Sequence, residues 1–540
     1  MSSLDKPSVA TSIARFLGRR NVRRVYGVPG EDHMEILAAL ADQGIPYVGA
    51  HDESAACIMA GAESQLTGRP AVAMVTLAPG LTNAINGIAN SYLDNLPLIV
   101  VCGQHPVNRQ SSVIRQYLDN RSLVAGVTKA FFSATATINH DLARAFANAV
   151  ADPPGPVLLE VRDEISRQPA MDEPDDWDWS STVGAKSWNV PDEVVELLAN
   201  AAHPAILVGS DVFGDPLDQI VGRVAAELRA PVFVTPSAKG RVAADDLWLA
   251  GTFVNGNLEH GILGRADVIV AIDLDAHEIF NRPWPYVPIV ALASRVSTQH
   301  YFPCLYEVVG APRETLAALH AQLSERDARS EWNEQDVVKY RQGLTYAFSS
   351  DAAELTIPAV IKLVQDHVPK DIIVAVDAGF GKALVSYLWT TGKWPSYFTS
   401  SGLSTMGYAI PAANALQLAT PLGQRVVAFM GDGSLLMRAA EISVAVALRL
   451  PCIYLVWMDA ALTQIGIKQR RSLLGEVGTK LLSHSCSRIG EAFGAAGQDV
   501  YDLVQLSAAL DEALARTSPT LIGVHVDQSR SDEWFERMRG

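Results

Sequence analysis

Residues 426–469 read VVAFMGDGSLLMRAAEISVAVALRLPCIYLVWMDAALTQIGIKQ, and this stretch decides the fold. Its first five residues, 426–430, are apolar and predict a buried parallel strand, which the sequence Gly431-Asp432-Gly433-Ser434 then interrupts. Apolar positions recur at helical spacing over 435–448, and a proline ends the predicted helix. A second apolar run at 452–457 predicts a return to the sheet. The stretch therefore predicts a strand–turn–helix–strand unit of a parallel α/β sheet.

An aspartate follows each of the two predicted strands, Asp432 after the first and Asp459 after the second. Open parallel sheets bind ligands at the carboxyl ends of their strands. The glycines on both sides of Asp432 let the backbone approach a ligand closely, and the amide groups at the start of a helix suit a phosphate. Mg²⁺ prefers oxygen ligands and usually binds one or two carboxylates together with phosphates. A turn aspartate and a strand-end cap remain the alternative, but two acids at adjacent strand ends favour a metal–phosphate site.

The stretch resembles the metal–diphosphate motif of thiamine diphosphate enzymes, which begins with GDG and ends in a pair of asparagines. The separation of Asp432 and Asp459, 459 − 432 = 27 residues, fits that family. The resemblance implies that Asp432 and Asp459 are Mg²⁺ ligands and that Ala461 offers its backbone carbonyl to the same ion. The sequence departs from the family where Met458 replaces the first asparagine and Leu462 replaces an aromatic residue.

The first 170 residues alternate between helical and strand patterns, which predicts a parallel sheet with helices on both faces. The expected elements are helices at Val9–Arg19 and 54–65, and strands at 25–28, 45–48, 71–76 and 98–102.

Five short segments of this part resemble, in order and spacing, the pyrimidine-binding domain of the acetolactate synthase group. They are GVPG at 27–30, HDE at 51–53, APGLTN at 78–83, GQ at 103–104 and RQYLDNRSLVAGVTK at 115–129.

The resemblance implies that Glu53 activates the aminopyrimidine and that Gln116 is the active-site glutamine. Asp52 separates His51 from Glu53, and Arg115 replaces the usual aromatic residue before the glutamine, which implies an altered substrate pocket. On local sequence alone, Glu53 could equally be a solvated glutamate at a helix start, where the helix dipole favours an acid. The glycine-bearing segment 78–83 is expected to form a turn between a strand and a helix.

A proline-, acid- and tryptophan-rich segment at 166–190 predicts a surface linker, whose Trp177, Trp179 and Trp188 pack against neighbouring domains. A second α/β pattern follows, and a polar helical segment at 314–341 leads to the third domain. The expected elements of the second pattern are strands at 205–209, 231–235 and Val268–Ile272 and a helix at 216–228.

Asp273 and Asp275 end a strand of this second pattern and suggest a nucleotide site, but no glycine fingerprint accompanies them. Members of the resembled family often bind a flavin in this domain. The arginine-containing loop of those members is not evident after Ile272, so a structural domain without FAD is favoured over a flavin-binding one.

The third domain begins with a predicted strand at 371–376, which ends in the sequence VDAGFGK at 376–382. This loop and the segment SSGLSTMGYAIPAANA at 400–415 resemble further cofactor-contacting segments. Met406 takes the place of the large apolar residue beneath thiamine diphosphate, although locally a methionine before a helix is more often a core residue. The implied cofactor-binding residues are Pro79, Asn83, Gly379, Phe380, Gly381, Gly402, Ser404, Met406, Gly431, Gly433, Ser434, Thr463, Gln464 and Ile465.

Length and composition agree with a multidomain globular protein of 540 residues, 49% of them hydrophobic. The net charge of −16 argues against a nucleic-acid binder. The five scattered cysteines predict reduced thiols, and neither a signal peptide nor a membrane-spanning run is found, so a cytoplasmic protein is expected.

The fold expected from these patterns is α/β, with three domains that are each a mainly parallel sheet flanked by helices. They are a pyrimidine-binding domain at 1–170, a central domain at 190–330 and a diphosphate-binding domain at 351–540. The resemblance implies a homodimer or homotetramer with its active sites at the subunit interface.

The implied reaction is decarboxylation of a pyruvate-like 2-oxo acid, dependent on thiamine diphosphate and Mg²⁺, with carboligation of the fragment to a second carbonyl compound. Simple decarboxylation or aldehyde lyase chemistry is the first alternative. A non-catalytic protein of the same fold is an alternative of another class, supported by the unusual MDAA sequence, and a flavin or nicotinamide oxidoreductase is a weaker one. His105, Arg115, Gln464, Ile465 and Gln469 are candidates for the substrate pocket.

Overall fold

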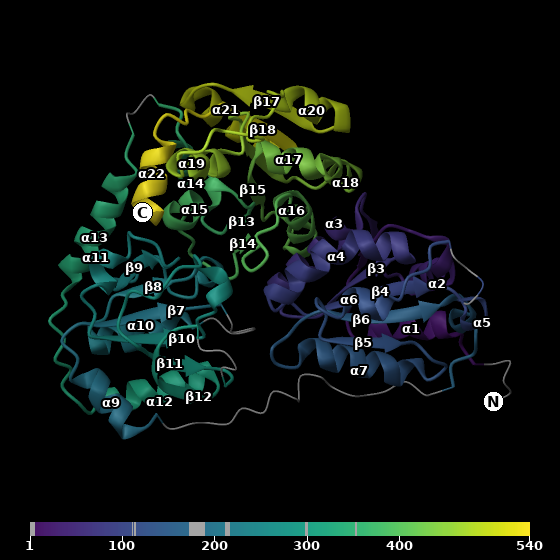
Figure 1. Cartoon of the computed structure of the whole chain (residues 1–540), viewed down its shortest axis with the longest axis horizontal. Helices are drawn as coiled ribbons and strands as arrows, with labels where there is room; N and C mark the ends of the chain where they lie inside the picture. Colours follow the sequence, from purple (N-terminus) through teal and green to yellow (C-terminus); the bar gives the residue numbers. More distant parts are fainter. Residues whose placement is uncertain are drawn as a thin grey trace. The chain divides into compact units, whose positions relative to one another are not determined.

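The computed structural model describes residues 6–110, 112, 115–171, 190–210, 217–296, 301–350 and 354–540. Their strands form three six-stranded sheets, in which every strand pairing is parallel. Helices flank the sheets (Figure 1). The expected fold class is therefore confirmed.

The first sheet has the strand order β2-β1-β3-β4-β6-β5. The strand predicted at 45–48 begins two residues late, because the backbone N–H of Ile45 instead closes the preceding helix by donating to the Leu40 carbonyl at 2.9 Å. The strands are β1 (Val25–Gly27), β2 (Tyr47–Gly49), β3 (Ala71–Val75), β4 (Leu98–Gln104), β5 (Ala130–Ser133) and β6 (Val157–Arg162).

Helices of the first sheet belong to a compact unit that contains the described residues of Met1–Val183, Gly402–Pro421 and Arg438–Leu450. The helix predicted at Val9–Arg19 has those bounds, with Ser8 as its N-cap. Two helices from later in the chain, α16 (Ala409–Ala419) and α18 (Ile442–Ala447), also belong to this first unit, and α16 packs against α3. The other helices are α1 (Val9–Arg19), α2 (Met34–Asp42), α3 (Glu53–Thr67), α4 (Ala78–Leu93), α5 (Val107–Gln110), α6 (Asn120–Val124), α7 (Ile138–Val150) and α8 (Asp163–Ser166).

The second sheet has the order β12-β11-β10-β7-β8-β9 and lies in a second compact unit. The single helical segment expected at 314–341 is wrong: it is two helices, because Ser324 ends the first and Asn333 caps the second with a capping box. The strands are β7 (Pro204–Val208), β8 (Val232–Val234), β9 (Leu249–Thr252), β10 (Val268–Ile272), β11 (Ile289–Ala293) and β12 (Cys304–Val309). The helices are α9 (Asp192–Ala199), α10 (Asp218–Leu228), α11 (His260–Leu263), α12 (Pro312–Leu323) and α13 (Glu334–Ala347).

The third sheet, also in the second unit, has the order β14-β13-β15-β16-β18-β17. Its strands are β13 (Ile373–Val376), β14 (Tyr397–Thr399), β15 (Val426–Gly431), β16 (Ile453–Trp457), β17 (Ala496–Val500) and β18 (Thr520–Val524). The remaining helices before, between and after these strands are α14 (Ile357–His367), α15 (Phe380–Leu388), α17 (Asp432–Arg438), α19 (Thr463–Arg471), α20 (Cys486–Phe493), α21 (Leu503–Ala515) and α22 (Ser531–Arg539).

The helix predicted at 435–448 is wrong in its start and in its continuity. It begins three residues earlier, at Asp432, where a carboxylate in the first turn is favoured by the helix dipole. It is then interrupted, because Arg438 leaves the helical conformation (φ −142°, ψ 31°) and a short 3₁₀ turn, η5 (Ala439–Glu441), precedes α18.

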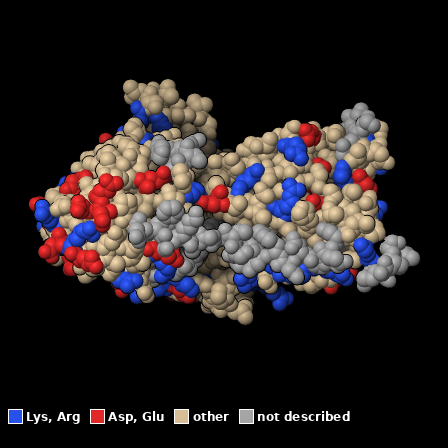
Figure 2. All heavy atoms as spheres, turned by 90° about the horizontal axis from the view of Figure 1, so that it is seen from below, with Lys and Arg blue, Asp and Glu red and all other residues tan. Residues whose placement is uncertain are grey.

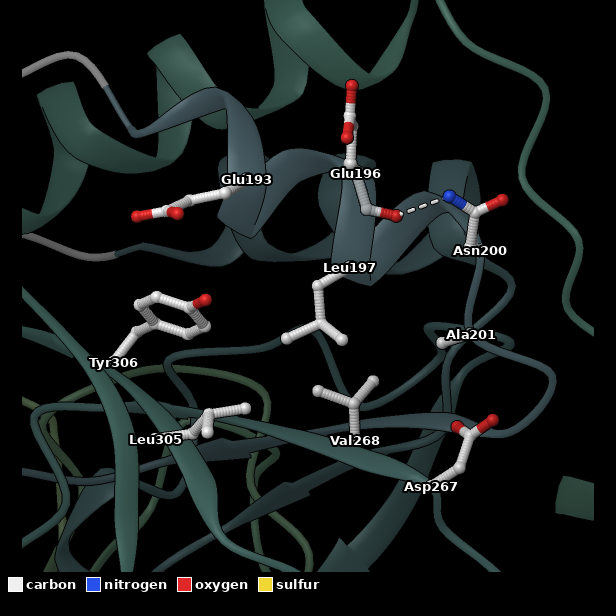
Figure 3. A pocket seen from close by; sticks show the side chains of 9 residues that line it. All are labelled: Glu193, Glu196, Leu197, Asn200, Ala201, Asp267, Val268, Leu305 and Tyr306. Carbon is white, nitrogen blue, oxygen red and sulfur yellow. Dashed lines mark hydrogen bonds between the residues drawn. The ribbon is translucent and has the colours of Figure 1, made fainter.

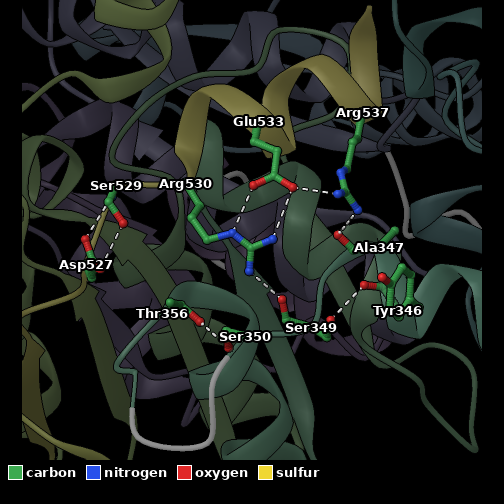
Figure 4. A network of polar contacts seen from close by, with 10 residues as sticks. All are labelled: Tyr346, Ala347, Ser349, Ser350, Thr356, Asp527, Ser529, Arg530, Glu533 and Arg537. Carbon is green, nitrogen blue, oxygen red and sulfur yellow. Dashed lines mark hydrogen bonds and ion pairs between the residues drawn. The ribbon is translucent and has the colours of Figure 1, made fainter.

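The C-terminal helix α22 is attached to the end of α13 within the second unit (Figure 4). Arg530 pairs with Glu533 and donates to the backbone carbonyl of Ser349 at 2.6 Å, and Arg537 donates to that of Ala347 at 2.7 Å. The buried side chains of Trp534 and Met538 support this attachment.

The surface carries acidic side chains over the part of the second unit where α9 lies, with basic side chains scattered between them (Figure 2). None of the helices within the described ranges is long and apolar enough to cross a membrane. The linker tryptophans Trp177, Trp179 and Trp188 lie outside the described residues.

Candidate active site

Asp432 stands at the carboxyl end of β15, in the middle of the third sheet. Only 2% of its surface is exposed. Its Oδ1 accepts the backbone N–H of Gly433 at 2.8 Å, and its Oδ2 accepts that of Ala460 at 2.7 Å. Burial raises the pKa of Asp432 in spite of these hydrogen bonds. The carboxylate is thus fixed by the backbone, beside the end of the neighbouring strand.

Asp459 follows that neighbouring strand, β16. The hydroxyl of Thr463, the first residue of α19, donates to its Oδ2, and the backbone N–H of Ala461 donates to its Oδ1 at 3.2 Å. Burial raises the pKa of Asp459 to about 6, and the negative charge of Asp432 raises it further. The predicted pair of carboxylates is therefore brought together at adjacent strand ends.

The negative charge of Asp432 disfavours the ionised form of Asp459, and a cation at this edge of the sheet would offset that repulsion. No group of three or more His, Cys, Asp or Glu side chains suited to a metal occurs within the described part of the chain. A divalent ion held by Asp432 and Asp459 would therefore complete its coordination with backbone and phosphate oxygens, which is the pattern usual for Mg²⁺.

Open space lies beside these strand ends. A Cβ added to Gly431 or to Gly379 would meet no heavy atom within 4 Å, and Gly379 has a φ of +135° that L side chains rarely adopt. In contrast, a Cβ on Gly381 would lie 2.5 Å from Nε1 of Trp457, so close packing requires glycine there. The loop before α15 therefore leaves room for a diphosphate.

Asp377 was missed by the sequence reasoning, although it lies within the quoted VDAGFGK segment. It is 2% exposed at the end of β13, and its Oδ1 accepts the hydroxyl of Ser434 at 2.8 Å. A signal was present, since an acid follows β13 as it follows β15 and β16. Asp377 thereby fixes one of the predicted cofactor-binding residues.

Glu53 belongs to the first unit and is the first residue of α3. Asp52 caps this helix by accepting the backbone N–H of Ala55 at 2.8 Å. Glu53 is 7% exposed, and its Oε2 accepts the side-chain amide of Asn83 at 3.1 Å. The alternative of a solvated glutamate is therefore wrong, because the carboxyl group is buried within the unit.

Segment 78–83 was expected to be a turn, and this is wrong: it forms the first turns of α4, with Pro79 near the helix start. Proline is tolerated there because its missing N–H would have no partner in the helix. The helical geometry carries Asn83 to Glu53.

The segment with Gly402, Ser404 and Met406 packs against α4 in the same unit. The backbone N–H of Gly402 donates to Asp94 at 2.7 Å, and a Cβ on Gly402 would lie 2.6 Å from the Cβ of Leu93. Ser404 is exposed with a φ of +51°, and Met406 is half-buried. Met406 is therefore not a fully buried core residue.

Gln116 is exposed, with a φ of +57°, and none of the contacts found among the described residues joins it to Glu53. In the second unit, Gln464 is half-buried in α19, whereas Ile465 is 45% exposed. The roles expected for these residues stay predictions.

Residues 7–148 match the model of the thiamine pyrophosphate enzyme N-terminal TPP binding domain, and residues 377–524 match that of the C-terminal TPP binding domain. The chain belongs to the thiamine pyrophosphate enzyme family. The relatives of this thiamine pyrophosphate enzyme include acetolactate synthases and a probable decarboxylase.

Three proteins that are similar in sequence to this thiamine pyrophosphate enzyme carry names of different activities. The catabolic acetolactate synthase of Raoultella terrigena is 25% identical over 96% of this chain and 95% of its own length. The acetolactate synthase isozyme 3 large subunit of Escherichia coli K12 is 28% identical over 95% of this chain and 93% of its own. The probable 2-ketoarginine decarboxylase AruI of Pseudomonas aeruginosa is 26% identical over 95% of this chain and 92% of its own.

A separate pocket of about 510 Å³ lies beside α9 (Figure 3). It adjoins Val268 and Tyr306, near the amino ends of β10 and β12, the edge opposite to that where parallel sheets bind ligands. Its Asp267 already accepts the backbone N–H groups of Ala202 and His203 at 2.7 and 2.9 Å. The pocket is not part of the candidate active site.

Proposed function

We propose that this enzyme decarboxylates a pyruvate-like 2-oxo acid and ligates the product to a second carbonyl compound, using thiamine diphosphate held by Mg²⁺. The observation that carries the proposal is the pair of carboxylates, buried Asp432 and half-buried Asp459, at adjacent strand ends beside open space. The acetolactate synthases among the relatives support carboligation.

At the metal end, Asp432 and Asp459 would bind the ion through oxygen atoms, with the carbonyl of Ala461 as a third protein ligand. Thr463 orients Asp459 through its hydroxyl, and the amides of Gly433 and Ala460 orient Asp432. The open space beside the backbone of Gly379 and Gly431 would accept the diphosphate. The amide groups at the start of α17 also suit a phosphate.

In the first unit, Glu53 would hold the proton that is exchanged with the aminopyrimidine of the cofactor. The side-chain amide of Asn83 donates a hydrogen bond to Oε2 of Glu53. We therefore assign the exchanged proton to the other carboxyl oxygen, Oε1. Glu53 is 7% exposed, so little of its surface is accessible to water. When bound, thiamine diphosphate supplies the electron sink that allows a 2-oxo acid to lose carbon dioxide.

Incubating the purified enzyme, thiamine diphosphate and Mg²⁺ with pyruvate, alone and with a panel of aldehydes and 2-oxo acids, tests the proposal. Carboligation predicts carbon dioxide release together with a 2-hydroxy ketone or an acetohydroxy acid. A second candidate, simple decarboxylation, is favoured by the similarity to the 2-ketoarginine decarboxylase and predicts a free aldehyde as the product. Absence of carbon dioxide release from every 2-oxo acid in the panel would refute both.

Two features at the strand ends of the central sheet support a domain without FAD. Gly209 and Asp273 directly follow the adjacent strands β7 and β10, and a Cβ on Gly209 would lie 2.1 Å from the Asp273 carbonyl oxygen. The buried carboxyl of Asp273 accepts the backbone N–H of Ser294 at 2.6 Å and would repel a phosphate. A central domain without flavin is therefore proposed, and a flavin absorption spectrum of the purified protein would contradict it.

A homodimer or homotetramer is proposed as the active form, with its active sites at the subunit interface. Exposed apolar side chains that lie close together in the sequence after α19 support self-association, since exposed apolar surface is common at interaction sites. These side chains are Leu473, Leu474, Val477 and Leu482. A cytoplasmic location stays the expectation.

A further inference from the structure

Glu441 is a buried acid that the proposed reaction does not use. It ends the short 3₁₀ turn η5 and is 1% exposed. Its Oε1 accepts the backbone N–H of His51 at 3.0 Å, and its backbone carbonyl accepts the side-chain amide of Asn414, in α16, at 2.8 Å. All three residues belong to the first unit. Glu441 therefore joins the chain just before α3 to α16.

The two residues before Glu53 depend on this contact. His51 and Asp52 precede the first residue of α3, where backbone N–H groups have no partner within the helix. The Asp52 side chain satisfies one of these groups, that of Ala55. The carboxyl group of Glu441 accepts the backbone N–H of His51 and faces the backbone N–H of Asp52. Hydrogen bonds to a charged acceptor are roughly twice as strong as neutral ones.

We propose that Glu441 is a positioning residue for Glu53: its carboxylate fixes the backbone at His51 and Asp52, so that Glu53 meets Asn83 and presents Oε1 for proton exchange. This inference rests on the proposed role of Glu53. Because Asn83 is held by α4 and Glu441 by α16, the orientation of the Glu53 carboxyl depends on both helices.

The charge of Glu441 changes near neutral pH. Burial raises its pKa to about 7; the hydrogen bond from His51 opposes this rise, the charge of Asp52 adds to it, and the charge of Arg438 opposes it. Another polar group nearby is the His51 ring, which contacts the hydroxyl of Ser443 at 3.2 Å. Positioning by the stronger, charged acceptor is therefore expected to improve as the pH rises through 7.

The test uses Glu441→Gln in the full-length protein loaded with thiamine diphosphate and Mg²⁺. Hydrogen–deuterium exchange at the thiazolium carbon, followed from pH 5.5 to 8.5, should slow by about 10- to 100-fold, since small misplacements of a catalytic group have effects of this order. The inflection near pH 7 should disappear. In a Glu53→Gln background the Glu441 substitution should have no further effect, because it acts through Glu53.

A readout that needs no cofactor is amide hydrogen exchange of the peptide that contains residues 50–56, which should accelerate in Glu441→Gln. The matched control is Glu63→Gln at the other end of α3. Glu63 is 6% exposed and bonds to Arg24 and Tyr26, so its substitution should lower the melting temperature without changing the pH profile of thiazolium exchange.

The outcomes separate this inference from the proposed function. If Glu53→Gln slows thiazolium exchange but Glu441→Gln does not, the positioning role is wrong and the proposed function stands. If Glu53→Gln has no effect, the proposed role of Glu53 fails, and unchanged amide exchange at 50–56 would separately refute the contact. Should Glu441→Gln fold poorly, Glu441→Asp keeps the charge but shortens the side chain, and a parental exchange rate in that variant would overturn the inference.

Discussion

Removing the charge of Asp459 should stabilise the metal-free enzyme. The pKa of this carboxyl rises from 3.8 to about 6, first because of burial and then because of Asp432. The folded chain therefore binds this proton more tightly than the unfolded chain, so stability falls as the pH rises from about 4 to 6. At about 1.36 kcal/mol per pH unit, the rise in pKa corresponds to a loss of folding stability of roughly 3 kcal/mol as an upper value. This loss is complete above about pH 6.

Asp459→Asn keeps an oxygen that can accept the Thr463 hydroxyl and bind Mg²⁺, but it removes the negative charge. In EDTA at pH 7.5 we expect a gain of about 1 to 3 kcal/mol, which corresponds to a rise of roughly 2–10 °C in the melting transition of the unit. At pH 4 the two proteins should melt alike, because the parental carboxyl is protonated there. Magnesium should still bind, since an amide oxygen is an acceptable ligand.

Differential scanning calorimetry at both pH values is the assay, and Asp499→Asn is the matched control. Burial alone would raise the pKa of Asp499, but hydrogen bonds from Ser485 and the backbone of Cys486 outweigh it and hold the pKa below its ordinary value. This control should therefore lose stability at pH 7.5. A melting temperature of Asp459→Asn that is unchanged in EDTA, or raised equally at pH 4 and 7.5, would refute the charge-repulsion argument.

Three further predictions concern the proposed reaction. Glu53→Gln should lower thiazolium proton exchange by about 10²- to 10⁴-fold, because a glutamine cannot exchange the proton; a parental rate by NMR would remove Glu53 from the mechanism. Asp432→Ala should abolish measurable thiamine diphosphate binding by calorimetry, and it should also lower stability, because the N–H groups of Gly433 and Ala460 lose their acceptor; unchanged cofactor affinity would contradict the metal assignment. Dilution to monomers should abolish turnover while the circular dichroism spectrum is kept, and an active monomer in analytical ultracentrifugation would contradict the interfacial site.

Periodicity and strand-end chemistry predicted much of the fold and of the metal end of the site. The runs at Val9–Arg19 and Val268–Ile272 have the predicted bounds because apolar spacing and local caps act within a few residues. The carboxyl pair was predictable because neighbouring parallel strands place their ends at one edge of a sheet.

Contacts between distant residues were not predictable in this way. The short turn η5 contains Glu441, whose hydrogen-bond partner His51 is 390 positions away in the chain. Asn83 was predicted as a cofactor residue, but its contact with Glu53 required a helix where the sequence suggested a turn. Glycine and proline favour both turns and helix starts, so local sequence does not distinguish the two.

The grouping of α16 and α18 with the first sheet has a consequence for dissecting this enzyme. Residues 53–64 of α3 are all buried, and part of this cover comes from α16, which is encoded more than 340 residues later. A fragment that ends near residue 170 lacks α16 and would therefore expose the alanine-rich face of α3. The helix that begins with Glu53 would then lose part of its packing. Gene fragments cut at the apparent domain linkers should give aggregating products, and complementation between separately expressed halves should succeed only when the second half supplies α16.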